Sequence, residues 1–139
     1  MNYPADIWGP PFWHFLHMIA MIYPDKPNRT MKKKYYDFIN NIPIFIPDEQ
    51  MSNRFADLIT LYPVSPYLDN NTSLSKWMHF IHNKVNELNG KSLLSYDDFT
   101  RTFKSQFNKT TDTHLQIRKH NIIYMCIIFI IIICIYFTL

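Results

Sequence analysis

The chain has 139 residues, of which 47% are hydrophobic and 17% aromatic, and its formal net charge is +3. This length suffices for one domain with a single core, and so mild a charge gives no reason to expect a nucleic acid as partner. Glycine occurs only 2 times, which excludes a glycine-rich phosphate loop, and both cysteines, Cys126 and Cys134, lie in one apolar block. Residues 1–125 therefore offer no disulfide, no thiolate nucleophile and no cysteine metal ligand.

The spacing of apolar residues in the first quarter of the chain predicts a helix. One face of this helix is formed by Trp13, Leu16, His17 and Ala20. Gly9 suits a turn before the helix, and Pro10 and Pro11 are tolerated in a first helical turn, where an N–H has no partner. Pro24 cannot continue the helix, which we therefore expect to end near that residue.

Two further helices follow in the sequence. The second is expected over residues 28–41, and the third runs from Asp48 and Glu49, acids that favour a first helical turn, to Tyr62. The apolar residues 44–46 connect them between two prolines. Each helix has apolar residues at the spacing of one buried face, which is typical of a helix bundle.

The fourth predicted helix is the most strongly patterned segment of the chain. It follows a polar loop over residues 63–73 and ends near Leu88, before the helix-stop pair Asn89-Gly90. His82 and Asn86 are four residues apart, so they share a face beside the apolar stripe. A histidine and a carboxamide at the edge of an aromatic core can hydrogen-bond a planar ligand, or they can simply bond backbone and water.

A capping-box pattern at Ser95 to Asp98 opens a fifth helix, and residues 108–113 read as a polar linker. No segment has strand periodicity of useful length. We therefore predict an all-α fold, a four-helix bundle plus a short fifth helix, followed by a C-terminal transmembrane helix. The inner face of the bundle should include Trp13, Leu16, Phe38, Phe55, Trp77, Ile81 and Val85.

Residues 122–139 are almost purely apolar, and at about 1.5 Å per residue they are just long enough to cross a bilayer. The basic residues Arg118, Lys119 and His120 precede them, which predicts that the helical domain stays on the cytosolic side. We expect three parts: a helical domain over residues 1–112, a basic linker over 113–120 and a transmembrane tail anchor over 121–139.

These motifs together resemble a known family. They comprise Trp8-Gly9 with Trp13, then Leu16-His17, Ala20 and Tyr23-Pro24, then Trp77, His82-Asn83-Lys84-Val85-Asn86 and Lys91. Their order and spacing over residues 7–105 resemble the Erv/ALR family of FAD-linked sulfhydryl oxidases, especially the compact forms of large DNA viruses.

The resemblance implies a four-helix bundle with a short fifth helix, often dimeric, that holds FAD at the bundle mouth. The residues implied to border the flavin are Trp8, Gly9, Trp13, His17 and Tyr23. Those implied to border the adenosine and phosphate portion are Trp77, His82, Asn83, Val85, Asn86 and Lys91. Aromatic rings stack on ring faces, Asn and His read ring edges, and a lysine offsets phosphate charge.

The chain departs from the family where the chemistry is done. The family carries Tyr-Pro-Cys-x-x-Cys at the start of its third helix, whereas Asp48 and Met51 stand at the two cysteine positions here. A carboxylate cannot form or break a disulfide, and a thioether has no thiol to oxidise. We therefore identify no catalytic residue and expect a degenerate member that has lost thiol oxidation.

Three functions stay open on the sequence. The first is a structural or interaction protein that links an inner virion membrane to a capsid protein. The second is a flavoprotein that retains FAD, or an oxidase whose dithiol comes from a partner. The third is a metal site built from His14, His17, His79 and His82; alternatively, His17 and His82 serve the flavin pocket while His14 and His79 point outward and no metal is bound.

Overall fold

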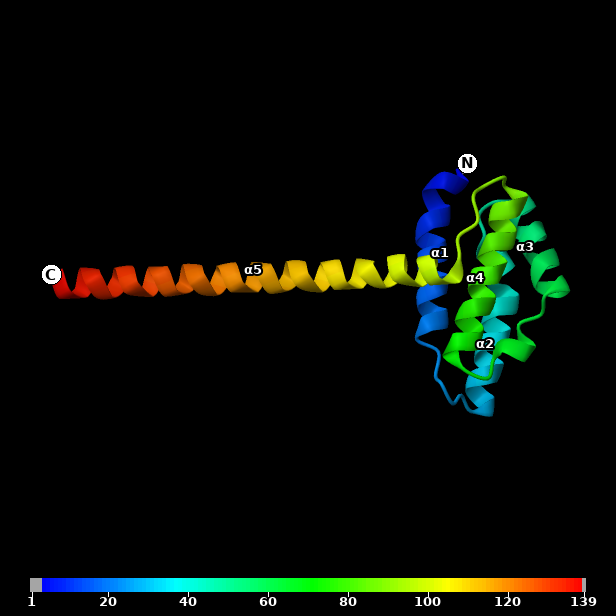
Figure 1. Ribbon diagram of the computed structural model, residues 1–139, viewed down its shortest axis with the longest axis horizontal. Coiled ribbons are helices and arrows are strands. Elements are labelled where there is room, and N and C mark those ends of the chain that lie inside the picture. Colours follow the sequence, from blue (N-terminus) through cyan, green and yellow to red (C-terminus); the bar gives the residue numbers. More distant parts are fainter. Residues whose placement is uncertain (1–3, 139) are drawn as a thin grey trace. The chain divides into compact units, whose positions relative to one another are not determined.

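The computed structural model describes the backbone of residues 4–138 and the side chains of 4–106, 118–125 and 127–129. It divides into two compact units, Met1–Leu94 and Ser95–Leu139. The elements of the first unit are α1 (Ala5–Met21), α2 (Arg29–Asn41), η1 (Ile42–Phe45), α3 (Glu49–Leu61), η2 (Ser65–Tyr67) and α4 (Asn71–Leu88) (Figure 1). The described residues contain no strand, so the predicted all-α class is confirmed.

Three of these helices begin directly after an Asn or Asp whose side chain caps them. The side chains of Asn28, Asp48 and Asn70 accept hydrogen bonds from the backbone N–H three residues later, at 2.8, 2.6 and 2.8 Å. Such a cap satisfies one of the donors that a helix start leaves unpaired. The cap at Asn70 explains why α4 begins at Asn71, within the segment that the sequence predicted to be a loop.

Helix α1 begins earlier than predicted. It starts at Ala5 and runs through Gly9, Pro10 and Pro11, so the expected turn at Gly9 is wrong. The φ of proline is fixed near the helical value, which lets the backbone continue as a helix. Each proline lacks an N–H donor and its ring crowds the carbonyl four residues earlier, yet the helix continues through both.

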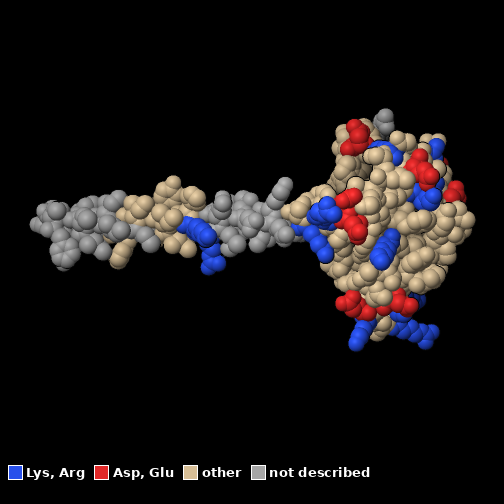
Figure 2. Space-filling view, in the orientation of Figure 1, with Lys and Arg blue, Asp and Glu red and all other residues tan. Residues whose placement is uncertain are grey.

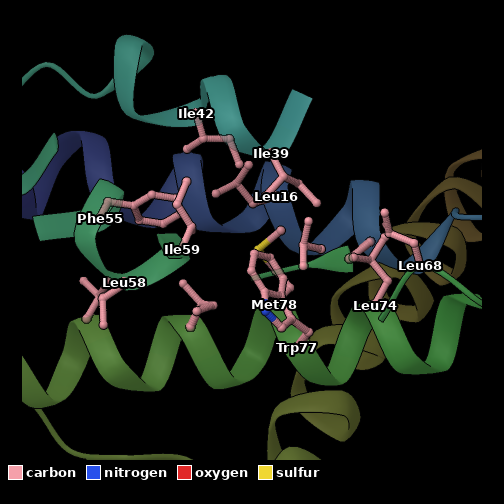
Figure 3. Close-up of a cluster of buried hydrophobic side chains, with 14 of the residues drawn as sticks. Leu16, Ile39, Ile42, Phe55, Leu58, Ile59, Leu68, Leu74, Trp77 and Met78 are labelled. Atoms are coloured by element: carbon pink, nitrogen blue, oxygen red, sulfur yellow. The ribbon is translucent and has the colours of Figure 1, made fainter. Parts of the chain in front are cut away.

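Helix α4 lies along one side of the buried core of the first unit and contributes Leu74, Trp77 and Met78 to it (Figure 3). Leu74, Met78 and Ile81 are at most 1% exposed, and side chains of α1, α2, η1 and α3 pack around them. Of the predicted inner face, five residues are buried, and Trp13 and Phe38 are partly buried against the core. The periodic apolar positions therefore identified the core correctly.

The buried aromatic side chains are also fixed through their polar atoms. The Trp77 indole N–H donates to the Tyr62 carbonyl at 3.0 Å, and the Tyr23 hydroxyl donates to the Leu68 carbonyl at 2.9 Å. Both acceptors lie in the connection between α3 and α4. These bonds hold that connection on the core without leaving a buried polar atom unpaired.

The second unit consists of α5 (Tyr96–Thr138), a single helix of 43 residues. Ser95 caps it as predicted, because its hydroxyl accepts from the Asp98 N–H at 3.1 Å. The predicted linkers over residues 108–113 and 113–120 are helical, so the fifth helix is not short. Neither segment contains Pro or Gly, and weak helix formers alone do not end a helix.

Among the described side chains, no helix is both long and apolar enough to span a membrane. The predicted span over residues 122–139 includes Cys126 and 130–139, whose side chains lie outside the described residues. The transmembrane assignment therefore stays a prediction.

Candidate functional site

A pair of histidines joins α1 to α4. The His17 Nε2 lies 2.8 Å from the His82 Nδ1, although the residues are 65 positions apart in the sequence. The Trp13 indole stacks on the His82 ring with centroids 4.0 Å apart and planes at 9°. The structure thus brings together three residues that the resemblance placed in one pocket.

Burial keeps this pair uncharged. Burial, reinforced by the neighbouring His82, lowers the pKa of His17 to about 3. Burial, with smaller effects from His79 and Lys91, lowers the pKa of His82 to about 4. At neutral pH one ring nitrogen therefore donates and the other accepts, and the site has polar edges without a fixed charge.

His14 and His79, the other two histidines of the predicted metal site, do not complete it. His14 is exposed on α1, as one alternative expected, but His79 is buried, so the expectation that it points outward is wrong. Its ring lies 3.5 Å from the Asn83 side chain, one turn further along the helix. Within the described part of the chain, no group of three or more His, Cys, Asp or Glu could hold a metal ion.

Asn83 binds the backbone at the end of the first unit. Its Nδ2 donates to the Leu94 carbonyl at 2.9 Å, and its Oδ1 accepts from the Leu94 N–H at 3.3 Å. Helix α4 ends at Leu88. Gly90 follows two residues later with a left-handed φ of +64°, and the Lys91 N–H donates back to the Asn86 carbonyl at 2.9 Å. The segment from Gly90 to Leu94 is therefore fixed at both ends.

The other residues implied by the resemblance occupy two kinds of position. Tyr23, Trp77 and Val85 belong to the buried core, so their role there is to shape the bundle. Trp8 is partly buried and meets Phe12 edge to face, with ring centroids 5.8 Å apart. No pattern of side chains pointed to Leu94, because it contributes its backbone N–H and carbonyl, which do not distinguish it from other residues.

Gly9 borders open space on α1. Gly9 is buried, yet a Cβ added there would meet no atom within 4 Å. Open space beside α1, an aromatic face at Trp13, ring nitrogens at His17 and His82 and a cation at Lys91 are the groups that a planar ligand with an anionic part requires. The described residues therefore fit a dinucleotide such as FAD.

Asp48 and Met51, which the resemblance aligned with the redox cysteines, lie at the start of α3. Asp48 is exposed and caps this helix through its bond to the Met51 N–H, and Met51 is partly buried against the core. One turn further on, the Phe55 ring lies 6.1 Å from the Trp13 ring. The beginning of α3 is thus close to the aromatic site, but its side chains carry a carboxylate and a thioether.

Helices α1 to α4 pack around one core, with a histidine and tryptophan cluster between α1 and α4. The architectural class of this unit is therefore a four-helix bundle. The crystal structure of the yeast Erv1 core shares this fold, with a TM-score of 0.68 and 24% identity over 75% of this chain and 86% of that chain. Residues 10–108 match the Erv1 / Alr family model. The chain belongs to the Erv1/Alr family.

Curated relatives include viral proteins. A probable FAD-linked sulfhydryl oxidase of Acanthamoeba polyphaga mimivirus is 35% identical over 92 residues, which are 66% of this chain and 64% of that protein. The FAD-linked sulfhydryl oxidase of an African swine fever virus isolate is 27% identical over 105 residues, 76% of this chain and 87% of that protein. The chain thus spans slightly less than two thirds of the mimivirus protein, and these relatives are FAD-linked.

Proposed function

We propose that the chain is a catalytically degenerate member of the Erv1/Alr family that acts as a membrane-anchored structural or interaction protein. One observation carries the loss of catalysis: the start of α3 holds Asp48 as a helix cap and Met51 as a packing residue. Thiol oxidation in this fold needs an attacking thiolate and a resolving thiol at these two positions, and neither residue has a sulfhydryl group.

The same proposal includes a retained FAD. The space beside Gly9 and the aromatic stack of Trp13 on His82 support it. When bound, FAD would supply a two-electron acceptor, and this chain would contribute its binding and orientation. A second function follows from the same pocket: a partner subunit could supply the dithiol and make the pair a thiol oxidase.

The remaining part of the proposal concerns the second unit. The side chains of Arg118, Lys119 and His120 and the apolar residues Ile122 to Met125 are exposed. A basic flank before an apolar segment favours a membrane anchor with the helical domain on the cytosolic side. The viral origin of two of the relatives supports a virion role, in which the protein, as a homodimer, links an inner membrane to a capsid protein.

An absorption spectrum and an oxygen electrode test the catalytic part. The full chain, purified in detergent, should show a bound flavin spectrum but no oxygen uptake with a dithiol substrate. The double variant Asp48→Cys with Met51→Cys should gain dithiol-dependent uptake, and Asp48→Ser with Met51→Ser serves as its thiol-free control.

The outcomes separate the alternatives. Oxygen uptake by the wild type with a small dithiol would refute the degenerate assignment. A colourless wild type and an inactive double-cysteine variant would leave the loss of oxidase activity standing and remove the retained FAD. Uptake that appears only when a dithiol-bearing partner protein is added would favour the second function.

A further inference from the structure

The side chain of Asn83 already uses both of its polar ends within the protein. Its amide nitrogen donates to the Leu94 carbonyl at 2.9 Å and its oxygen accepts from the Leu94 N–H at 3.3 Å. The Asn83 side chain thus bonds both the N–H and the carbonyl of Leu94, as a paired backbone residue would. If Asn83 read the edge of a ligand with the same atoms, it would have to give up this bond.

The bond to Leu94 closes a short segment that begins where α4 ends. At the other end of this segment, Gly90 turns the chain in the left-handed region and the Lys91 N–H returns to the Asn86 carbonyl at 2.9 Å. Residues 91–94 have no regular secondary structure of their own. The clamp formed by Asn83 and Leu94, together with a bond from the His79 ring to the Leu94 backbone, fixes the end of this segment to α4.

The segment brings the charge of Lys91 to the candidate site. The Lys91 N–H bonds the Asn86 carbonyl, one helical turn after His82 on α4, and the Lys91 charge contributes to the low pKa of that histidine. Lys91 itself is exposed, so its position depends on the backbone that carries it. A lysine held beside the histidine and tryptophan cluster is placed to meet an anionic part of a ligand.

We propose that Asn83 is a positioning residue and not a ligand contact: its clamp on Leu94 holds Lys91 beside His82, where the phosphates of FAD would bind. This inference rests on the proposed retention of FAD, and it assigns Asn83 a different role from the adenosine contact that the family resemblance implied. His17, His82 and Trp13 then meet the ring systems, and Asn83 acts through Lys91.

The test compares Asn83→Ala, Lys91→Met and the double variant in the full chain. FAD and riboflavin, which lacks phosphate, are titrated by flavin fluorescence. Asn83→Ala should weaken FAD binding about tenfold, leave riboflavin binding unchanged and add no further loss in the Lys91→Met background. Asn41→Ala is the matched control, because it also removes one bond from an Asn side chain to backbone, at 2.6 Å to the Asp37 carbonyl on α2.

A second measurement needs no ligand. Amide hydrogen exchange should become about tenfold faster at both Leu94 and Lys91 in Asn83→Ala and stay unchanged there in Asn41→Ala. If Asn83→Ala does not fold, Asn83→Asp replaces it, since it keeps the acceptor for the Leu94 N–H and loses the donor to the Leu94 carbonyl.

Three results would overturn the proposal. One is an equal loss of affinity for FAD and for riboflavin in Asn83→Ala. The others are the same tenfold loss of FAD affinity when Asn83→Ala is added to Lys91→Met, and an unchanged rate of amide hydrogen exchange at Lys91 in Asn83→Ala. If the wild type binds no FAD, the proposed function fails by itself. The exchange at Lys91 then still decides whether the clamp holds this lysine.

Discussion

Substitution of Gly9 should change the stability of the protein and its affinity for FAD in opposite directions. Gly9 lies inside α1, where glycine is less favourable than alanine by about 1 kcal/mol, and an added Cβ meets no atom within 4 Å. Gly9→Ala should therefore raise the free energy of unfolding by up to about 1 kcal/mol and weaken FAD binding, because the methyl group would occupy the ligand's space. Urea unfolding followed by tryptophan fluorescence and a flavin titration measure the two effects.

Gly90→Ala is the comparison for this prediction. Its φ of +64° is unfavourable for alanine, so this variant should be less stable than the wild type. A Gly9→Ala protein that is destabilised to the same extent would show that the space beside Gly9 is not open.

The His17 and His82 pair should make the protein sensitive to mild acid. The pKa values of His17 and His82, about 3 and about 4, lie below the 6.5 of an unfolded histidine. The unfolded chain therefore binds more protons at intermediate pH. Their contribution is complete above pH 6.5 and is lost as the pH falls towards 4, with a slope of about 1.4 kcal/mol per pH unit for each histidine.

Urea unfolding at pH 7.5, 6 and 5 measures this slope before most carboxylates titrate. All 3 tryptophans lie in α1 and α4, so their fluorescence reports the unit that holds the pair. The variant His17→Gln removes one of the two titrating groups and should flatten the dependence. An equally steep dependence in that variant would assign the acid sensitivity to other groups.

At the scale of an element, Asp48 stabilises the start of α3. The Asp48 side chain accepts from the Met51 N–H at 2.6 Å, and its negative charge lies at the positive end of the helix. Asp48→Ala should lower the free energy of unfolding by about 1 kcal/mol and leave FAD binding unchanged. Chemical denaturation of the two proteins measures the difference.

Asp57 provides the control on the same helix. It is exposed in the interior of α3, where alanine is a better helix former than aspartate, so Asp57→Ala should be neutral or slightly stabilising. Equal destabilisation by the two substitutions would mean that the cap at Asp48 contributes nothing specific.

For the whole molecule, the predicted anchor can be tested by deletion. The mixture of acidic and basic side chains on the face of the helical unit in Figure 2 gives no single-sign patch there that would attract a charged membrane surface. Membrane attachment should therefore depend on residues 122–139. Their deletion should move the protein from the membrane pellet to the supernatant, as judged by fractionation after a salt wash.

Substitution of Arg118 and Lys119 by glutamine in the undeleted chain is the matched comparison. These changes remove the basic flank but keep the apolar segment, so the protein should still pellet. A deleted protein that stays in the pellet would refute the anchor.

The sequence by itself determined the helices and their buried faces. Local signals act within a few residues and can be recognised from the sequence. They are the helical periodicity, the Asx and Ser caps and the glycine at position 90. The inner-face residues Leu16, Phe55, Trp77 and Ile81 were predicted from spacing and are buried. The absence of a thiol at positions 48 and 51 is likewise a property of the sequence alone.

Only the tertiary structure decided which polar groups meet. The bond between His17 and His82 joins residues 65 positions apart, and the partner of Asn83 is the backbone of Leu94, for which no side-chain pattern exists. Local patterns also failed at the helical Gly9-Pro10-Pro11 and in the unbroken α5. Long-range contacts set pKa values and use up hydrogen-bonding atoms, and these effects separate a ligand contact from a residue that holds another in place.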